Sequence, residues 1–215
     1  ANTHVILEQN IRDLDNAHMN QLDDAMIDRL KLDQQRLQTI ADGLVNLSKL
    51  DDPNQQVLET YQPENGLIID KVSVPLGVIG IIYESRPNVI VDAFGLCFKA
   101  GNTVILKGGK EAIHSNLAFE KIIQATLKEN NLNPHIIQCI KSTDRETTHA
   151  MMKLNQYIDV LIPRGSQGLI KAVLENSTIP VIETGAGNCH IYVDQYADIN
   201  MALDLIENAK CQRLG

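Results

Sequence analysis

VPLGVIGIIYESRPNVIVDAFGLCFKAGNTVILKGGK, residues 74–110, is the stretch of sequence that determines the fold. The apolar run at Val78–Tyr83 predicts a buried strand, and Val89–Ala100 has the three- and four-residue spacing of a helix. A Gly-Asn turn follows, and Thr103–Leu106 predicts a second strand. A strand, a helix and another strand in this order are typical of a parallel sheet with a helical crossover.

The same alternation continues to the end of the chain. Helices are expected over Glu111–Asn130, Thr143–Leu154, Gly168–Glu175 and Ile199–Lys210, and strands over Ile136–Ile140, Ile158–Ile162 and Pro180–Ile182, with extended backbone at Ile191–Val193. Either Thr143 or Asp144 is expected to cap the second of these helices. The pattern predicts an α/β fold with a doubly wound, mostly parallel sheet.

Residues 1–50 are expected to be helical, because apolar residues recur there at spacings near three and four. Turn residues at 51–54 end this region. Val57–Tyr61 and Leu67–Val74 then flank a second turn, and the latter run predicts an extended strand. We expect residues 57–74 to be able to pair with another subunit.

Composition limits the class of protein. With 215 residues, 44% of them hydrophobic, the chain can bury the core of one good-sized domain or two small ones. Its net charge of -8 argues against nucleic acid or an anionic membrane as the main partner, although a local cationic pocket for phosphate is compatible with it. No apolar stretch is long enough to span a bilayer, and the polar first twenty residues predict no secretory signal.

The cysteines and histidines are too scattered to predict a metal site. Cys97, Cys139, Cys189 and Cys211 lie far apart, and no histidine stands at metal-ligand spacing from two of them. We therefore expect no zinc and a reducing, cytoplasmic setting. The first residue, Ala1, lies inside a helical pattern, and the sequence stops directly after another helix, so we expect a piece of a longer polypeptide.

Two strand exits carry residues suited to phosphate. Lys107, Gly108 and Gly109 end one strand, where glycines permit close backbone approach and a lysine can neutralise phosphate. Gly165 and Ser166 end another, before a helix whose N-terminus favours anions. The alternatives are a solvated lysine on an ordinary turn and a simple helix cap. Neither exit has the GxGxxG spacing, so a classical Rossmann motif is not predicted.

Other candidate residues have equally plain alternatives. Arg86 could bind a carboxylate or phosphate, or form a surface ion pair with Glu84 or another acid. Glu183, in IPVIETGAGNCHIYVD at 179–194, could be a general base, bind ribose hydroxyls or cap a nearby backbone group. Cys189 could be a nucleophile or a small buried apolar residue. For His190 a core or solvent-facing structural position is expected.

These residues together resemble the gamma-glutamyl phosphate reductase family of the aldehyde dehydrogenase superfamily. The resemblance rests on VPLGVIGIIYESRPNVIVDA, GNTVILKGGKEAIHSN, DVLIPRGSQGLIKAVLENSTIPVIETGAGNCHIYVD and ENAKCQR, and it extends to DRLKLDQQRLQTIADGL near the start. It implies a cofactor domain of the aldehyde dehydrogenase type. The implied reaction, a step of proline biosynthesis, reduces L-glutamate 5-phosphate to the 5-semialdehyde with NADPH and releases phosphate. In it a cysteine thiolate displaces phosphate to form a thioester, which hydride then reduces.

The resemblance also assigns cofactor contacts. Lys107, with Gly108, takes the position of the strand-end lysine that meets the cofactor's adenosine ribose or its 2′-phosphate. Gly165 and Ser166 fall near the superfamily's pyrophosphate turn, although the spacing to the next glycine is shorter here. Glu183, with Thr184 and Gly185, faces the cofactor. Glu183 matches a glutamate that activates water in oxidising relatives, and reduction of an acyl phosphate needs no such water.

Substrate contacts and the nucleophile are assigned in the same way. Arg86 and Asn88 are implied anion or oxyanion contacts. The family's nucleophilic cysteine lies beyond Gly215, so Cys189 and Cys211 are not it. Residues 1–215 then form an NADP-binding domain without the catalytic domain, inactive alone and homo-oligomeric when full length. A non-catalytic binding or assembly module, or an aldehyde dehydrogenase with another substrate, is the alternative.

Overall fold

Four parallel strands form the sheet that the apolar runs predict. The computed structural model describes residues 2–183 and 190–211, and the chain divides into two compact units, 1–183 and 184–215. In the first unit, β3 (Val78–Tyr83), β4 (Thr103–Lys107), β5 (Ile137–Cys139) and β6 (Val160–Arg164) pair in the order β5-β4-β3-β6. Every pairing is parallel. The predicted α/β fold with a doubly wound parallel sheet is therefore confirmed.

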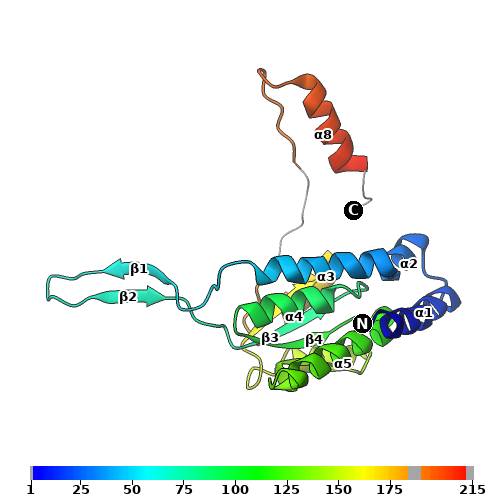
Figure 1. Ribbon diagram of the computed structural model, residues 1–215, viewed down its shortest axis with the longest axis horizontal. Helices are drawn as coiled ribbons and strands as arrows, with labels where there is room; N and C mark the ends of the chain where they lie inside the picture. Colours follow the sequence, from blue (N-terminus) through cyan, green and yellow to red (C-terminus); the bar gives the residue numbers. More distant parts are fainter. Residues whose placement is uncertain (1, 184–189, 212–215) are drawn as a thin grey trace. The chain divides into compact units, whose positions relative to one another are not determined.

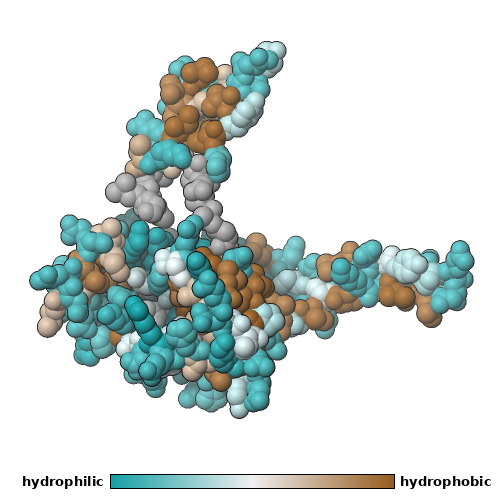
Figure 2. Space-filling view, turned by 180° about the vertical axis from the view of Figure 1, so that it is seen from behind, coloured by the Kyte–Doolittle hydropathy of each residue, from teal (hydrophilic) through white to brown (hydrophobic). Residues whose placement is uncertain are grey.

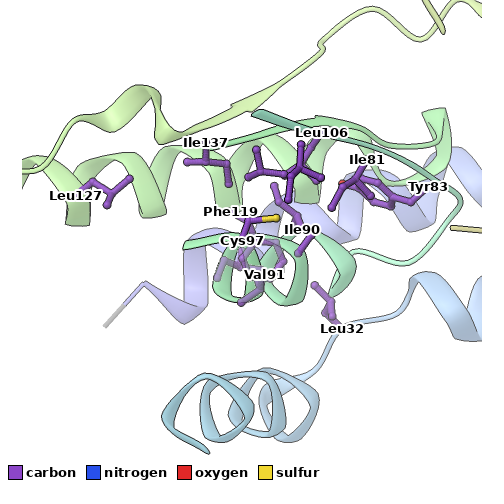
Figure 3. Packing of buried hydrophobic residues seen from close by; sticks show 14 residues of the cluster. Leu32, Ile81, Tyr83, Ile90, Val91, Cys97, Leu106, Phe119, Leu127 and Ile137 are labelled. Atoms are coloured by element: carbon purple, nitrogen blue, oxygen red, sulfur yellow. The ribbon is translucent and has the colours of Figure 1, made fainter. Parts of the chain in front are cut away.

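Helices cover both faces of this sheet. They are α4 (Val89–Lys99), α5 (Ile113–Glu129), α6 (Arg145–Met151) and α7 (Gln167–Asn176), with short 3-10 turns at Lys110–Ala112 and Pro134–Ile136. Side chains of β3 alternate between the faces, as strand geometry requires. Ile81 and Tyr83 pack with α4 and α5 in one core cluster (Figure 3), whereas Ile82 packs with residues of α6 and α7 in another. The central strand is apolar on both sides because neither face meets solvent.

The helical N-terminal region consists of three helices, α1 (Thr3–Met19), α2 (Asp24–Leu30) and α3 (Gln34–Ser48) (Figure 1). The breaks between them follow from capping. Asp23 accepts a hydrogen bond from the Met26 amide at 2.7 Å, and Asp33 accepts one from the Arg36 amide at 2.7 Å. Each carboxylate satisfies a free N–H in the first turn of its helix, so a new helix begins at each aspartate.

A buried polar cluster joins α1 to α5. Ala112, at the N-cap position of α5, has no side chain that can cap the helix. Asp13 of α1 takes that role, because its carboxylate accepts from the His114 amide at 3.0 Å, the Ser115 amide at 2.8 Å and the Ser115 hydroxyl at 2.6 Å. Asn10 adds a bond to the Ser115 hydroxyl at 3.1 Å. The N-terminal helices are thus attached to the sheet through α5.

The predicted extended pair at residues 57–74 is an antiparallel ribbon. β1 (Val57–Tyr61) pairs with β2 (Ile69–Val72), and the ribbon extends away from the parallel sheet (Figure 1). All of its residues are exposed. Figure 2 shows hydrophobic side chains along it, and Leu58 and Tyr61 are 60% and 61% exposed. Two isolated strands are only marginally stable in water. The apolar side chains of this ribbon form a surface that nothing else in the described chain covers.

Several predicted boundaries are wrong. β6 begins two residues later than expected, because the Ile158 amide still bonds to the carbonyl of Leu154 in the turn after α6. The predicted strand at Pro180–Ile182 is a single parallel bridge between Val181 and Leu161. α6 begins after Asp144, whose side chain makes no cap bond to it.

The second unit is described over residues 190–211. It contains α8 (Ile199–Cys211), which confirms the predicted helix. Ile191–Val193 forms no strand, since the described part of this unit offers no second strand with which to pair.

Candidate functional site

The strand order creates a topological switch point between β3 and β6. From β3 the chain continues through β4 to β5 on one side, and β6 returns to the other side of β3. In open α/β sheets, ligands bind outside the carboxyl ends of the strands at this kind of point. Glu84 directly follows β3, and Gly165 and Ser166 directly follow β6. The predicted phosphate-binding turn at Gly165 and Ser166 therefore lies at the position where the topology favours a ligand.

Glu84 and Ser166 are bonded across the switch point. The Ser166 amide donates to Glu84 Oε2 at 2.8 Å, and the Ser166 hydroxyl donates to Glu84 Oε1 at 2.8 Å. Ser166 is also the N-cap of α7, where its Oγ accepts from the Leu169 amide at 3.4 Å. A Cβ on Gly165 would lie 2.7 Å from Glu84 Oε2, so the carboxylate packs against the glycine backbone.

Lys107 is a buried cation at the end of β4. Only 5% of its surface is exposed, and Nζ donates to the Gly108 carbonyl at 3.1 Å. Burial lowers the pKa of Lys107, while the negative charges of Glu111 and Asp144 act in the opposite direction. Within the described residues Lys107 forms no ion pair. Its ammonium is therefore suited to a ligand that brings negative charge or oxygen acceptors.

Buried polar side-chain atoms lie next to Gly108. The Tyr83 hydroxyl and both amide atoms of Asn116 are buried and have no hydrogen-bond partner. A Cβ on Gly108 would lie 2.5 Å from Asn116 Nδ2 and 3.0 Å from the Tyr83 hydroxyl. Burial, followed by the nearby Cys139 and Glu120, raises the pKa of Tyr83, so the phenol stays protonated. A side chain at position 108 would therefore require the buried Asn116 amide or the Tyr83 ring to move.

The loop after β3 approaches the loop after β4. A Cβ on Gly109 would lie 3.2 Å from the Ser85 amide nitrogen. Ser85 has a φ of 41°, in the left-handed region that non-glycine residues rarely occupy, and the next amide, that of Arg86, donates to the Glu84 carbonyl at 2.6 Å. This turn is strained, and it carries the candidate substrate residues Arg86 and Asn88.

The two candidate substrate residues differ in their environment. Arg86 is exposed. An ion pair between Arg86 and Glu84 is not found in the described chain, because the Glu84 carboxylate is bonded to Ser166 instead. Asn88 is half-buried and its amide donates to Asp92 at 2.9 Å. Arg86 is thus available to an anion, whereas Asn88 already has a partner.

The remaining candidates lie near the end of the first unit or beyond it. Glu183 is exposed. Thr184, Gly185 and Cys189 lie outside the described residues. His190 is exposed, which agrees with the solvent-facing position.

Two thiols of the first unit are poor nucleophiles. Burial raises the pKa of Cys97 to about 11. Burial and the neighbouring Glu120 raise the pKa of Cys139 further. Both thiols are therefore protonated at neutral pH. Across residues 2–183 and 190–211, no three His, Cys, Asp or Glu side chains are grouped as a metal site would need. No helix in the same ranges is long and apolar enough to cross a membrane.

Comparison with known proteins shows the family of this chain. The sequence pattern of the aldehyde dehydrogenase family matches residues 2–215. The chain belongs to the aldehyde dehydrogenase family. It is 54% identical over 215 residues to a gamma-glutamyl phosphate reductase of Lachnospira eligens, covering all of this chain and 52% of the relative.

Two crystal structures of relatives are also similar. The gamma-glutamyl phosphate reductase of Thermotoga maritima has a TM-score of 0.90 at 42% identity, over 99% of this chain and 51% of the other. That of Saccharomyces cerevisiae has a TM-score of 0.77 at 32% identity, over 98% and 54%. This aldehyde dehydrogenase family chain spans about half the length of the curated relatives it matches.

Sequence reasoning missed two parts of the site. It treated Glu84 only as an ion-pair partner of Arg86, although its place directly after a buried strand was a signal. It gave no role to Asn116, which lies in the middle of a helical pattern and approaches Gly108 only in the folded chain.

Proposed function

We propose that this chain is the NADP(H)-binding portion of a gamma-glutamyl phosphate reductase. The whole enzyme would reduce L-glutamate 5-phosphate to L-glutamate 5-semialdehyde with NADPH and release phosphate, a step of proline biosynthesis in the cytoplasm. One observation carries the proposal. In a chain 54% identical to such a reductase, the buried Lys107 and the Ser166 donors lie at the carboxyl ends of β4 and β6, the two strands that flank β3 beside the switch point of a parallel sheet.

The residues present fit a dinucleotide. Lys107, buried and without an ion pair in the described chain, would meet the adenosine ribose or its 2′-phosphate. Gly108 leaves the backbone open to close approach. Gly165 and the Ser166 amide and hydroxyl would meet the pyrophosphate, where the dipole of α7 also favours negative charge. Glu183, with Thr184 and Gly185, would face the nicotinamide side.

The catalytic groups would be shared between this chain and a segment that would follow Gly215. When bound, the nicotinamide supplies the hydride that reduces the acyl group. Arg86 would hold the substrate's phosphate, and Asn88 would contribute an amide near the reacting carbonyl. By resemblance to the reductase family, the nucleophilic thiolate would come from beyond Gly215, and the protonated Cys97 and Cys139 are unsuited to that role. The chain alone would therefore bind cofactor without turnover.

Direct titration tests the proposal. NADPH fluorescence should saturate on addition of the chain. Lys107→Gln should raise the dissociation constant of NADPH about tenfold, as expected for loss of a charged contact worth about 1.4 kcal/mol. Lys121→Gln, the same change on the exposed surface of α5, is the matched control and should leave the constant unchanged. Absence of saturable binding of either NADPH or NADP to a folded sample would refute the proposal.

The exposed ribbon supports a second candidate function, assembly. We propose that β1 and β2 pair with another copy of the chain and that the full-length enzyme is a homo-oligomer. Ile69→Glu, in the apolar surface of β2, should shift sedimentation towards the monomer. Gln35→Glu, which adds the same charge on the exposed surface of α3, is the control and should leave sedimentation unchanged. A wild-type chain that sediments as a monomer at every concentration tested would contradict this role.

The substrate requires a separate test. Phosphate-dependent reduction of NADP by the full-length enzyme, measured on several semialdehydes, would distinguish a gamma-glutamyl phosphate reductase from an aldehyde dehydrogenase with another substrate.

A further inference from the structure

Glu84 binds the donors that the proposed function assigns to the cofactor's pyrophosphate. We propose that Glu84 is an internal competing anion, and that the pyrophosphate binds at α7 only when this carboxylate leaves Ser166. The inference rests on the proposed function and adds a conformational step to it. We call the contact between the Glu84 carboxylate and Ser166 the latch.

The latch is held by a specific geometry. Each carboxylate oxygen accepts one hydrogen bond from Ser166, both at 2.8 Å, and the stem of Glu84 packs against Gly165, where a Cβ would lie 3.0 Å from Glu84 Cγ. A carboxylate and a phosphate are both oxyanions with similar demands for N–H and O–H donors. Glu84 therefore imitates, at the first turn of α7, the contacts that a phosphate would make.

The position of the latch is what links it to a ligand. Independently of any hydrogen bond, the strand order β5-β4-β3-β6 places the ligand crevice between the carboxyl ends of β3 and β6. Glu84 comes from the first of these ends and Ser166 from the second. The contact therefore spans the crevice in which a dinucleotide would be bound.

Both anions cannot occupy the site together. The Ser166 amide and hydroxyl have one hydrogen each, and both hydrogens are directed to Glu84. A pyrophosphate placed there would also lie within a few ångströms of a carboxylate of the same sign. Cofactor binding must therefore release the carboxylate, and the measured affinity is reduced by the fraction of molecules in which the latch is closed.

Release of the latch would also affect the loop that carries the candidate substrate residue Arg86. Glu84 is followed by Ser85, whose φ of 41° is strained, and by the Arg86 amide, which donates to the Glu84 carbonyl at 2.6 Å. In this proposal the release also moves the Glu84 backbone, and with it the turn that positions Arg86. Cofactor binding is thereby coupled to the placement of a residue that would hold the substrate.

The test compares NADPH binding by the wild-type 215-residue chain with Glu84→Gln and Glu84→Ala. Gln keeps the size of the side chain and removes its charge, and Ala removes the latch entirely. Both should lower the dissociation constant of NADPH by about five- to tenfold, the gain expected if the latch is closed in most molecules. Glu175→Gln, at the other end of α7 with the same change in charge, should leave the constant at the wild-type value.

Wild-type amide exchange gives a measurement that does not depend on the folding of a variant. NADPH should accelerate exchange of the Arg86 amide, since its turn loosens when Glu84 leaves. If the wild type binds NADPH saturably and both variants have an unchanged or higher dissociation constant, the latch is overturned and the proposed function is left intact. The same holds if the wild type binds NADPH saturably but exchange of the Arg86 amide is slowed or unaffected. No binding by the wild type or either variant would overturn the proposed function, and the latch with it.

Discussion

Replacement of Asp13 should destabilise the whole first unit, because this carboxylate takes the place of a missing helix cap. It is 1% exposed and accepts three hydrogen bonds from His114 and Ser115. Hydrogen bonds to a charged group contribute about 1.5–3 kcal/mol each, but burial of the carboxylate offsets much of the sum. We therefore expect Asp13→Ala to lower the free energy of unfolding by about 3 kcal/mol, and Asp13→Asn by about 1–2 kcal/mol.

The pH dependence of this effect has a definite sign. Burial raises the pKa of Asp13, and the bonds from Ser115 and His114 offset only part of that rise. The folded state thus binds the proton more tightly than the unfolded state does. The contribution of Asp13 is fully present below the ordinary aspartate pKa of about 3.9 and declines as pH rises through the raised value. The asparagine of Asp13→Asn does not titrate, so the variant's deficit in free energy of unfolding relative to wild type should shrink from pH 4 to pH 7.

Urea unfolding followed by circular dichroism at several pH values measures both effects. Asp15→Asn, an exposed change on the same helix, is the control and should shift the free energy of unfolding by less than about 0.5 kcal/mol. Equal stability of Asp13→Ala and wild type would show that α5 does not need the carboxylate. A deficit of Asp13→Asn that grows as the pH rises would refute the argument from burial.

Two further predictions concern glycines and thiols. Gly108→Ala should destabilise the chain by about 1–3 kcal/mol, because its Cβ would lie 2.5 Å from Asn116 Nδ2. Gly43→Ala, with nothing within 4 Å of its Cβ, should instead stabilise the chain by about 0.5–1 kcal/mol. Equal thermal unfolding temperatures of the two variants would contradict the contact at Gly108. In the folded chain, Cys97 and Cys139 should react with iodoacetamide at pH 8 far more slowly than a free cysteine, since the thiolate fraction of a thiol with a pKa of about 11 is roughly one in a thousand; mass spectrometry that finds either one rapidly labelled would refute it.

The sequence was sufficient for the elements with strong local patterns. Val78–Tyr83 was predicted with its observed bounds, because a continuous apolar run of six residues between turn signals is typical of a buried parallel strand. The N-terminal helices were predicted as a region but not as three helices. Their breaks depend on Asp23 and Asp33, which cap through single side-chain bonds within a polar, otherwise helical pattern. At Pro180–Ile182 a strand was overpredicted, because pairing depends on a neighbouring strand and not on apolar residues alone.

The sequence indicated candidate residues where a residue type and a strand end coincide, as at Lys107 and Ser166, and their function stays a prediction. The contact between Glu84 and Ser166 was not, since it joins residues 82 positions apart and depends on the strand order. Helix cap and phosphate ligand were treated as alternatives for Ser166, yet a hydroxyl can accept and donate at once. Ser166 accepts from the Leu169 amide as a cap and still has its proton to donate. Capping therefore does not exclude an anion at this turn. The Glu84 carboxylate, which already receives that proton, is what a pyrophosphate would have to displace.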